Sequence, residues 1–486
     1  MTINLKVSQV PPREQRLGSV TGYAGDLQDL VSQARCGSLE SRDRCFKQTS
    51  TCVSCALFGL TTIKDVAVVN HAPAGCSAIG IGVQVMNRQL AARRGTTNNS
   101  VIIGTGMDEA DTVFGATDSL KEIILQVYER YHPRAIFIGT SCVTGIIGED
   151  IDSVADELSQ ELPVPVKPVH CEGFRTHIWI GGQDVVGHTV LNTFVKPPKV
   201  KTNKINFINF FESARDEIIE TFGKFGLEPV FLMVNSTVEE LEHLSEAICT
   251  TSMCGTLGTY LGNALEQEYG VPYVRTLNPS GVTGYETFLR EIGRVTGRSE
   301  PIEEHIAEQR ELYINQIEEL KKKLKGLRVV IGMGPGYALE IARVVDELGM
   351  EVVWNTSWHF DTNYDNGEVP PAAAYLADKG LNFGMSVSDQ QNYELLNVIN
   401  TYKPDLYLSR HTGTTVWAIK QGVPALCVAD EYMIYGHKRV LEFGQAVLDT
   451  INNRSFEVNL ARRTKLPYTD WWYQQKPTAL LREVTV

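Results

Sequence analysis

The sequence lacks the features of membrane, secreted and nucleic-acid-binding proteins. No apolar stretch approaches the roughly 20 residues of a transmembrane helix. The N-terminal residues MTINLKVSQVPPREQRLG contain no apolar core of the length found in signal peptides. Basic residues are in deficit, and the net charge of −13 argues against non-specific binding of nucleic acid, which needs a basic face. We therefore expect a cytoplasmic protein that binds neither a membrane nor nucleic acid.

Zinc-ribbon spacing is also missing, although the chain has ten cysteines. No second CxxC or HxxxH follows the pair Cys52 and Cys55 at zinc spacing. Disulfides are rare in a reducing cytoplasm, so clustered cysteines indicate metal or redox chemistry. Small buried packing residues are the better explanation for three of the ten, which are Cys36, Cys45 and Cys171.

Cys52, Cys76 and Cys142 are widely separated in the sequence. Cys76 ends the segment HAPAGC, and Cys142 follows an apolar run, AIFIGT, that predicts a strand. Loops at such places can converge on a large ligand, and thiolates match soft iron centres. The residues alone therefore favour an iron–sulfur cluster over isolated structural cysteines.

Short β-branched runs alternate with amphipathic segments along most of the chain, which predicts parallel sheets covered by helices. The Pro- and Lys-rich segment VKPPKVKTNK reads as a linker, and a charged helical segment at 303–325 ends at Gly326. We place domain boundaries at these two points. The expectation is an α/β protein with three Rossmann-like domains, at residues 1–200, 201–326 and 327–486.

Ligands of open parallel sheets bind beyond the carboxyl ends of the strands, which is where Cys142 falls. The segment RVVIGMGPGYALEIA also has a Gly-rich turn between strand and helix. Its glycines Gly332, Gly334 and Gly336 do not make GxGxxG. Tight turn geometry with close backbone approach is the plain interpretation of this turn.

A series of motifs occurs in the order and spacing of one known family. The segments IKDVAVVNHAPAGC, TSCVTGIIGEDID, VPVKPVHCEGFR and CGTLGTYLGNALEQEYGVPY resemble the α-type subunit of nitrogenase component 1 and its scaffold and nitrogenase-like relatives. The match continues through GLRVVIGMGPGYALEIARVVDELGMEVV, HFDTNYDNG and YKPDLYLSRHTG. It spans roughly residues 45–440, a breadth that accidental similarity to one motif does not produce.

The resemblance implies two clusters. An interfacial eight-iron cluster of the P-cluster type, shared with a homologous β-type subunit, would be held by Cys76, Cys142 and an upstream cysteine. Cys52 fits that third position best, and Cys55 is its rival. The catalytic iron–sulfur cofactor would hang from Cys254 at the junction of the three domains. A separate ATP-dependent iron–sulfur reductase protein would supply electrons to an oxygen-sensitive pair of such heterodimers.

The cofactor pocket departs from nitrogenase in two ways. Nitrogenase holds the far end of its cofactor with a histidine, but GVPALCVADEYMIYGHKR has none at that place. Cys427 is the only soft ligand close by and is also readable as a core residue; His437 aligns poorly. The arginine-bearing loop of nitrogenase corresponds to GMGPG here, and losing that charge beside an anionic cluster should change its potential and affinity. We expect an iron-only, precursor-like cofactor in preference to one with molybdenum.

Nitrogenase also has a glutamine and a histidine after the CEGFR segment, and the histidine donates to the cofactor. The resemblance assigns these catalytic roles to Gln183 and His188, with His177 as the alternative histidine. A histidine protonates near neutral pH and can serve a proton-coupled reduction. A polar residue at a helix start is the competing interpretation for both histidines.

The altered pocket argues against a standard molybdenum nitrogenase. The pattern is most similar to the nitrogenase-like methylthio-alkane reductases, which cleave carbon–sulfur bonds of small volatile thioethers. A dinitrogen-reducing α-subunit is the alternative enzyme. A maturation scaffold is the alternative of another class, because a cluster that is loosely held at its far end can leave. The retained cysteines argue against a relative that binds no cofactor.

Overall fold

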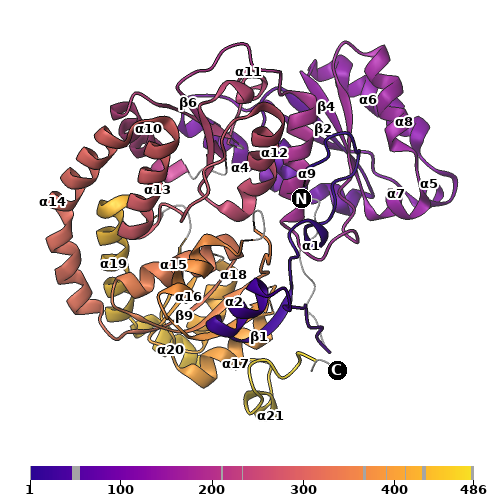
Figure 1. Ribbon diagram of the computed structural model, residues 1–486. Helices are drawn as coiled ribbons and strands as arrows, with labels where there is room; N and C mark the ends of the chain where they lie inside the picture. Colours follow the sequence, from indigo (N-terminus) through magenta and orange to yellow (C-terminus); the bar gives the residue numbers. More distant parts are fainter. Residues whose placement is uncertain are drawn as a thin grey trace.

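Figure 1 shows the computed structural model of the chain, with three separate sheets flanked by helices. The structure describes residues 2–45, 55–208, 212–232, 234–364, 368–389, 391–410, 412–428 and 434–482. Within these residues, paired strands run parallel except at one sheet edge. The prediction of an α/β fold with parallel sheets between helices is confirmed.

The first sheet has the order β3-β2-β4-β5, with β2 (Val66–His71), β3 (Val101–Gly104), β4 (Ala135–Thr140) and β5 (Val166–Val169). Its helices are α3 (Cys55–Leu60), α4 (Ala74–Arg93), α5 (Glu109–Phe114), α6 (Thr117–Tyr131), α7 (Cys142–Ile147), α8 (Ile151–Glu161) and α9 (Gly181–Thr193). In β2, Val66 and Val68 pack with α3 and α9, whereas Ala67 and Val69 pack with α6 and α8. Helices thus cover both faces, which explains why β2 is apolar at successive positions.

The second sheet has the order β7-β6-β8, with β6 (Lys204–Ile208), β7 (Glu228–Leu232) and β8 (Cys249–Ser252). Its helices are α10 (Arg215–Lys224), α11 (Val238–Glu242), α12 (Gly255–Tyr269) and α13 (Gly281–Thr296). Aromatic packing fixes two of these helices. The ring of Phe207 in β6 lies 5.1 Å from that of Phe222 in α10 and 6.5 Å from that of Phe288 in α13, measured between centroids.

The third sheet has the order β1-β11-β10-β9-β12-β13. Its strands are β1 (Gly22–Asp26), β9 (Arg328–Met333), β10 (Glu351–Ser357), β11 (Gly384–Ser388), β12 (Leu406–Ser409) and β13 (Ala425–Cys427). Its helices are α2 (Leu27–Arg35), α15 (Pro335–Glu347), α16 (Pro371–Asp378), α17 (Asn392–Tyr402), α18 (Thr412–Lys420) and α19 (Gly436–Asn452). The five parallel strands follow the Rossmann order.

Strand β1 differs from the expected domain organisation. Residues 1–200 were expected to form one domain, yet β1 pairs antiparallel with β11 of the third sheet, with Gly22 opposite Ser388. Its sequence, GYAGD, carries no strand pattern. Close approach explains the first glycine, because a Cβ on Gly22 would lie 1.8 Å from the Arg42 carbonyl oxygen. All other strands lie within the expected ranges, and the boundaries near 200 and 326 stay predictions.

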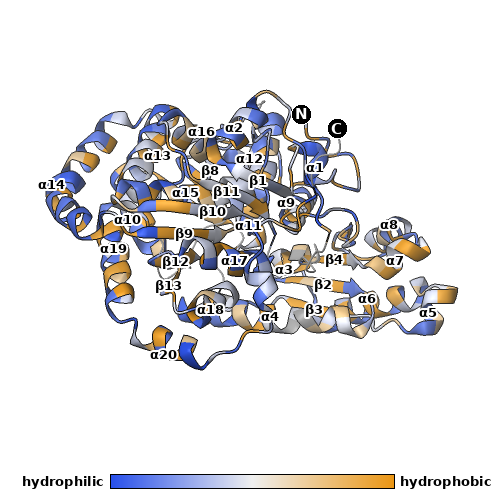
Figure 2. Cartoon of the chain, turned by 90° about the horizontal axis from the view of Figure 1, so that it is seen from below, coloured by the Kyte–Doolittle hydropathy of each residue, from blue (hydrophilic) through white to orange (hydrophobic). Residues whose placement is uncertain are grey.

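Each sheet and its helices form one unit of the chain. Helix α14 (Ser299–Leu324) connects the second and third units along the side of the molecule (Figure 1) and packs on α13 and α19. In Figure 2, strands β2, β3, β9 and β10 are mainly apolar, whereas α14 mixes both kinds of residue. The C-terminal helices α20 (Ser455–Arg463) and α21 (Asp470–Tyr473) pack on α18 and α17. Among the described residues, no helix combines the length and the apolarity that crossing a membrane requires.

Candidate functional site: cysteines at the strand-order reversals

Each sheet has one point where the strand order reverses, and a crevice opens there beyond the carboxyl ends of the strands. In the first sheet the reversal lies between β2 and β4, which are neighbours with His71 opposite Thr140. Cys76 follows β2 and Cys142 follows β4. The topology therefore brings these two cysteines, 66 positions apart, to one edge of the sheet, and their role as cluster ligands stays a prediction.

Both thiols are exposed on the chain. Cys142 is the first residue of α7, whose N-cap Ser141 forms a capping box with Thr144. The backbone N–H of Gly173 donates to the Cys142 sulfur at 3.2 Å, the kind of contact that cluster thiolates receive. Exposed thiols at a crevice fit a cluster that a second chain completes.

The third ligand of this cluster stays a prediction. Cys52 lies outside the described residues, and of Cys55 only the position at the start of α3 is described. Among the described residues, no group of three or more His, Cys, Asp or Glu side chains is arranged to hold a metal ion.

The second and third sheets share a cavity that is partly open to the surface. Cys254 follows β8 at the reversal of the second sheet, and the reversal of the third sheet lies between β9 and β12. The cavity has a volume of about 150 Å³. Its walls come from all three units and consist of Trp179, Ile180, Cys254, Thr256, Leu257, Gly334, Pro335, Gly336, Tyr337, Trp358, His359 and Arg410. A cavity thus lies at the junction where the cofactor was expected.

Cys254 occupies the N-cap position of α12 and is 3% exposed. Burial raises the pKa of its thiol, while the Arg410 charge and the N–H groups of Leu257 and Thr256 act in the opposite direction. The loop after β9 approaches the sulfur closely, because a Cβ on Gly336 would lie 2.2 Å from it. This close approach is the reason for glycine at the last position of GMGPG.

A cation that the sequence did not single out, Arg410, reaches this cavity from the end of β12. The GMGPG loop has no arginine, but Arg410, one residue after β12, lines the cavity. Its guanidinium lies 4.3 Å from the centroid of the Tyr337 ring. Trp179 and Trp358 meet edge to face with centroids 6.2 Å apart. The cavity therefore combines one thiol, one fixed positive charge and aromatic walls, which suits an anionic iron–sulfur cofactor.

His359 is a further cavity residue that the sequence did not indicate. The residue is 2% exposed, and its Nε2 has no hydrogen-bond partner; the nearest carboxylate oxygen, on Asp361, is 3.6 Å away. Burial lowers the pKa of His359 to about 4, so the imidazole is neutral. A usable signal existed, because His359 lies two residues beyond the end of β10, just as Cys142 lies beyond β4.

The two residues to which the resemblance assigned catalytic roles do not line this cavity. Neither Gln183 nor His188, both on α9, is among the residues that line the cavity; Trp179 fills that wall. His188 is buried, with Nδ1 2.9 Å from the Tyr260 hydroxyl and Nε2 2.8 Å from the Val7 carbonyl oxygen. Burial lowers the pKa of His188. These contacts give His188 a structural position, and its catalytic role and that of Gln183 stay predictions.

The alternatives are likewise outside the cavity. His177 is exposed, and its backbone N–H donates to Glu14. Cys427 is half-buried at the end of β13, opposite Ser409 of β12, and is not among the lining residues. His437 is buried with Nε2 3.0 Å from the Glu286 carboxylate.

Helix α1 (Arg13–Arg16) of the N-terminal arm is bonded to segments beside the cavity. Arg13 donates to Asp184 at 2.7 Å and to the Thr256 carbonyl oxygen at 2.6 Å, and its other Nη lies 3.3 Å from Asp361. Arg16 donates to Asp184 at 2.9 Å. Burial alone would raise the pKa of Asp184, but the two guanidinium groups hold it below its usual value.

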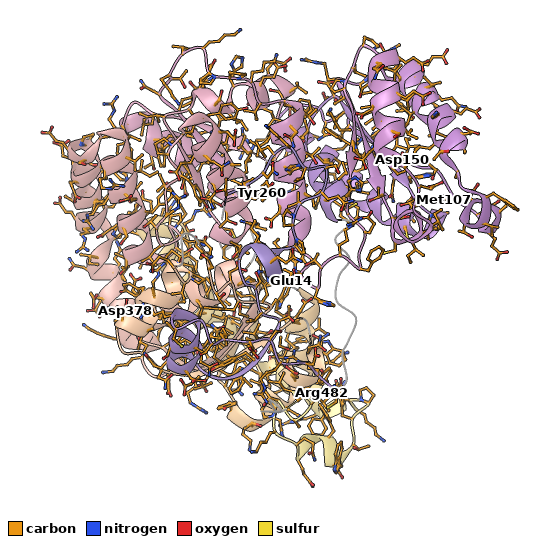
Figure 3. The ribbon with its side chains drawn as sticks, turned by 45° about the vertical axis from the view of Figure 1, so that its right-hand side comes forward. Glu14, Met107, Asp150, Tyr260, Asp378 and Arg482 are labelled. Carbon is orange, nitrogen blue, oxygen red and sulfur yellow. The ribbon has the colours of Figure 1, made fainter. Side chains whose placement is uncertain are left out.

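This buried ion cluster was missed because the arm matched no recognised motif. Figure 3 shows Glu14 of α1 at the centre of the molecule, between the upper and lower units, and Tyr260 of α12 above it. Through Thr256 and Asp361, the arm contacts residues two positions away from Cys254 and His359. The arm therefore fixes two segments that form the cavity wall.

Comparison with known proteins identifies the family. The family described as nitrogenase component 1 type oxidoreductase matches residues 51–452, which is most of the chain. The chain belongs to this family. Membership implies iron–sulfur clusters, a β-type subunit and a reductase partner in general terms.

The individual relatives include nitrogenase alpha chains and a cofactor biosynthesis protein. The chain is 28% identical to the nitrogenase molybdenum-iron protein alpha chain of Methanothermobacter marburgensis over 381 residues, covering 75% of this chain and 79% of that protein. It is 28% identical to the nitrogenase iron-molybdenum cofactor biosynthesis protein NifE of Methanosarcina barkeri over 407 residues, covering 79% and 82%. A solved structure of nitrogenase Cp1 at pH 5 aligns with a TM-score of 0.68 and 21% identity, covering 91% of this chain and 100% of that chain.

Proposed function

We propose that the chain is the catalytic subunit of a cytoplasmic, nitrogenase-like iron–sulfur reductase that cleaves the carbon–sulfur bonds of small thioethers, as methylthio-alkane reductases do. The cavity beside Cys254 carries this proposal. Its aromatic walls, from Trp179, Trp358 and Tyr337, suit a small apolar substrate, and thioether sulfur makes favourable contacts with aromatic rings. The balanced reaction adds two electrons and two protons to a thioether and releases a thiol and an alkane.

The cysteines divide between two clusters in this proposal. Cys76, Cys142 and Cys52, with Cys55 as the rival for the last position, hold an interfacial eight-iron cluster with the β-type subunit. Cys254 holds an iron-only cofactor, which supplies low-potential electrons to the substrate when bound. Arg410 balances negative charge in the cavity, and the indole and phenol rings exclude water. An ATP-dependent iron–sulfur reductase protein supplies the electrons.

A maturation scaffold is the second candidate. The chain is as similar to the NifE of Methanosarcina barkeri as to a nitrogenase alpha chain, at 28% identity in each case. Cys427, the only soft ligand near the expected far-end position, does not line the cavity. A dinitrogen-reducing α-subunit is the alternative enzyme, and it shares the cysteine arrangement.

The test is anaerobic purification of the chain with its β-type subunit, followed by measurement of iron, molybdenum and vanadium and by an assay with the reductase and ATP. Ethyl methyl sulfide is the test substrate, and reactions without ATP are the control. High iron without molybdenum or vanadium, together with ATP-dependent release of ethane and methanethiol, supports the proposal. High iron without turnover of the thioether or of dinitrogen would overturn it in favour of the scaffold. Ammonia formation would identify a nitrogenase instead.

A further inference from the structure

The far-end ligand of the cofactor is the part of the site that the sequence left open. Cys427 was the soft side chain nearest the expected position, but it lies at the end of β13, one strand beyond β12, and does not line the cavity. His437 is buried against Glu286. Neither residue is placed to complete a site that begins at Cys254.

The cavity wall itself contains a suitable group. Among the lining residues, Cys254 and His359 are the two whose side chains are common ligands of iron. The Nε2 atom of His359 is buried without a hydrogen-bond partner among the described residues. Buried polar atoms in folded proteins nearly always have a partner, so an orphaned imidazole nitrogen beside a cavity indicates a contact that a bound group supplies.

Hydrogen bonds fix the backbone of His359 and the carboxylate beside it. The Ser357 hydroxyl donates to the His359 carbonyl oxygen at 2.7 Å and so ties down its backbone. The Asp361 carboxylate lies 3.6 Å from Nε2 and is itself held by the Ser19 hydroxyl and by Arg13. A carboxylate that orients a metal-bound histidine normally accepts from the other ring nitrogen, whereas Asp361 faces Nε2 itself, so the backbone contact is what fixes His359.

The position of His359 beyond the carboxyl end of a strand also favours it as the second ligand. His359 follows β10, Arg410 follows β12, and Gly334 follows β9, so all three lie at the carboxyl edge of the third sheet. Cys254 reaches the same cavity from the second sheet. A ligand pair of Cys254 and His359 would span the junction between two sheets.

We propose that His359 is the second protein ligand of the cofactor bound at Cys254, in place of the histidine that the sequence lacks near residue 427. This inference rests on the cofactor of the proposed function but not on its substrate. It assigns the far-end contact to the loop after β10, in the segment HFDTNYDNG.

The test uses the complex with the β-type subunit, purified anaerobically with all histidines labelled with ¹⁵N, and pulsed electron paramagnetic resonance of the reduced cofactor. The wild type should show strong nitrogen coupling that changes between ¹⁴N- and ¹⁵N-histidine protein. His359→Gln should lose this coupling and, after gel filtration, retain cofactor about tenfold less well. His437→Gln is the matched control, because it alters an equally buried histidine outside the cavity, and Cys427→Ala tests the rival ligand; both should keep the coupling.

The outcomes separate the ligand from the function. A loaded wild-type cofactor without histidine nitrogen coupling would overturn the proposal, and this measurement does not depend on whether His359→Gln folds. Unchanged coupling in His359→Gln, or its loss in His437→Gln instead, would also overturn it. If the wild type contained only enough iron for the interfacial cluster, the proposed function itself would be overturned. Histidine coupling without thioether turnover would support His359 as a ligand and would overturn only the proposed substrate.

Discussion

Cys142 and Cys254 each follow a parallel strand at a reversal of strand order, yet their thiols have opposite surroundings. Cys142 is exposed on the first unit, whereas Cys254 is 3% exposed among residues of all three units. Exposed apolar side chains near Cys142 include Ile146 on α7, at 75% exposure. The comparison teaches that the same position beyond a strand end can serve two purposes. An exposed thiol needs a second chain to enclose its ligand. The ligand of a buried thiol is surrounded by residues of this chain.

The largest expected effect is the loss of a different cluster when Cys254 or Cys142 is replaced. Cys254→Ala should abolish cofactor binding and turnover and leave the interfacial cluster, because its sulfur is the only thiol among the described residues that line the cavity. Cys142→Ala should instead remove the interfacial cluster and weaken association with the β-type subunit. Iron content, cluster spectra and size-exclusion chromatography measure both losses. Equal loss of both clusters in both variants would contradict the division.

The buried ion cluster tests how strongly the N-terminal arm stabilises the segments beside the cavity. Asp184→Asn leaves Arg13 and Arg16 with a neutral partner in a site where Asp184 is 1% exposed. Breaking such a buried pair should lower the free energy of unfolding by about 3–5 kcal/mol, measured by denaturant unfolding of the anaerobic complex. Asp378→Asn, which alters the exposed pair with Arg35, is the control and should leave stability unchanged within error. A similar small effect in both variants would show that the arm is dispensable.

Two neighbouring glycines offer a matched pair at the cavity wall. An alanine Cβ at Gly336 would lie 2.2 Å from the Cys254 sulfur, whereas at Gly334 nothing lies within 4 Å and φ is −59°. Gly336→Ala should destabilise the protein by about 1–3 kcal/mol and displace the thiol, with loss of cofactor. Gly334→Ala should bind cofactor as the wild type does. Thermal unfolding and iron analysis check both, and indistinguishable variants would mean that the loop stands further from Cys254.

The smallest expected effect is a difference in alkylation rate between the exposed and the buried thiols of the cluster-free chain. Cys76 and Cys142 should react at least about tenfold faster than Cys254, because exposed thiols are accessible to the reagent. Cys249 is the internal control, since burial raises the pKa of its thiol to about 12 and it is fully enclosed. Peptide mass spectrometry over a time course gives the rates. Equal rates for Cys142 and Cys254 would indicate that the cavity opens without its cofactor.

Local sequence patterns were sufficient for most of the fold. The apolar runs that predicted strands at 135–140 and 328–332 correspond to β4 and β9, and the charged segment at 303–325 lies in α14. Strand β1 was missed because GYAGD has no alternating apolar pattern and pairs with a strand, β11, that is far away in the sequence. Arg13 was missed for a related reason, since its partners Asp184 and Asp361 are 171 and 348 positions away.

By itself, the sequence determined the alternation of strands and helices, the family, and the positions of Cys76, Cys142 and Cys254, because strand periodicity and motif spacing act over short distances along the chain. Only the tertiary structure decided which side chains share the cavity. Arg410 and His359 line the cavity, whereas Gln183, His188 and Cys427 do not, because the strands β12 and β10, which precede the first two, flank β9 in the sheet. Strand order is set by long-range packing, which no local pattern records.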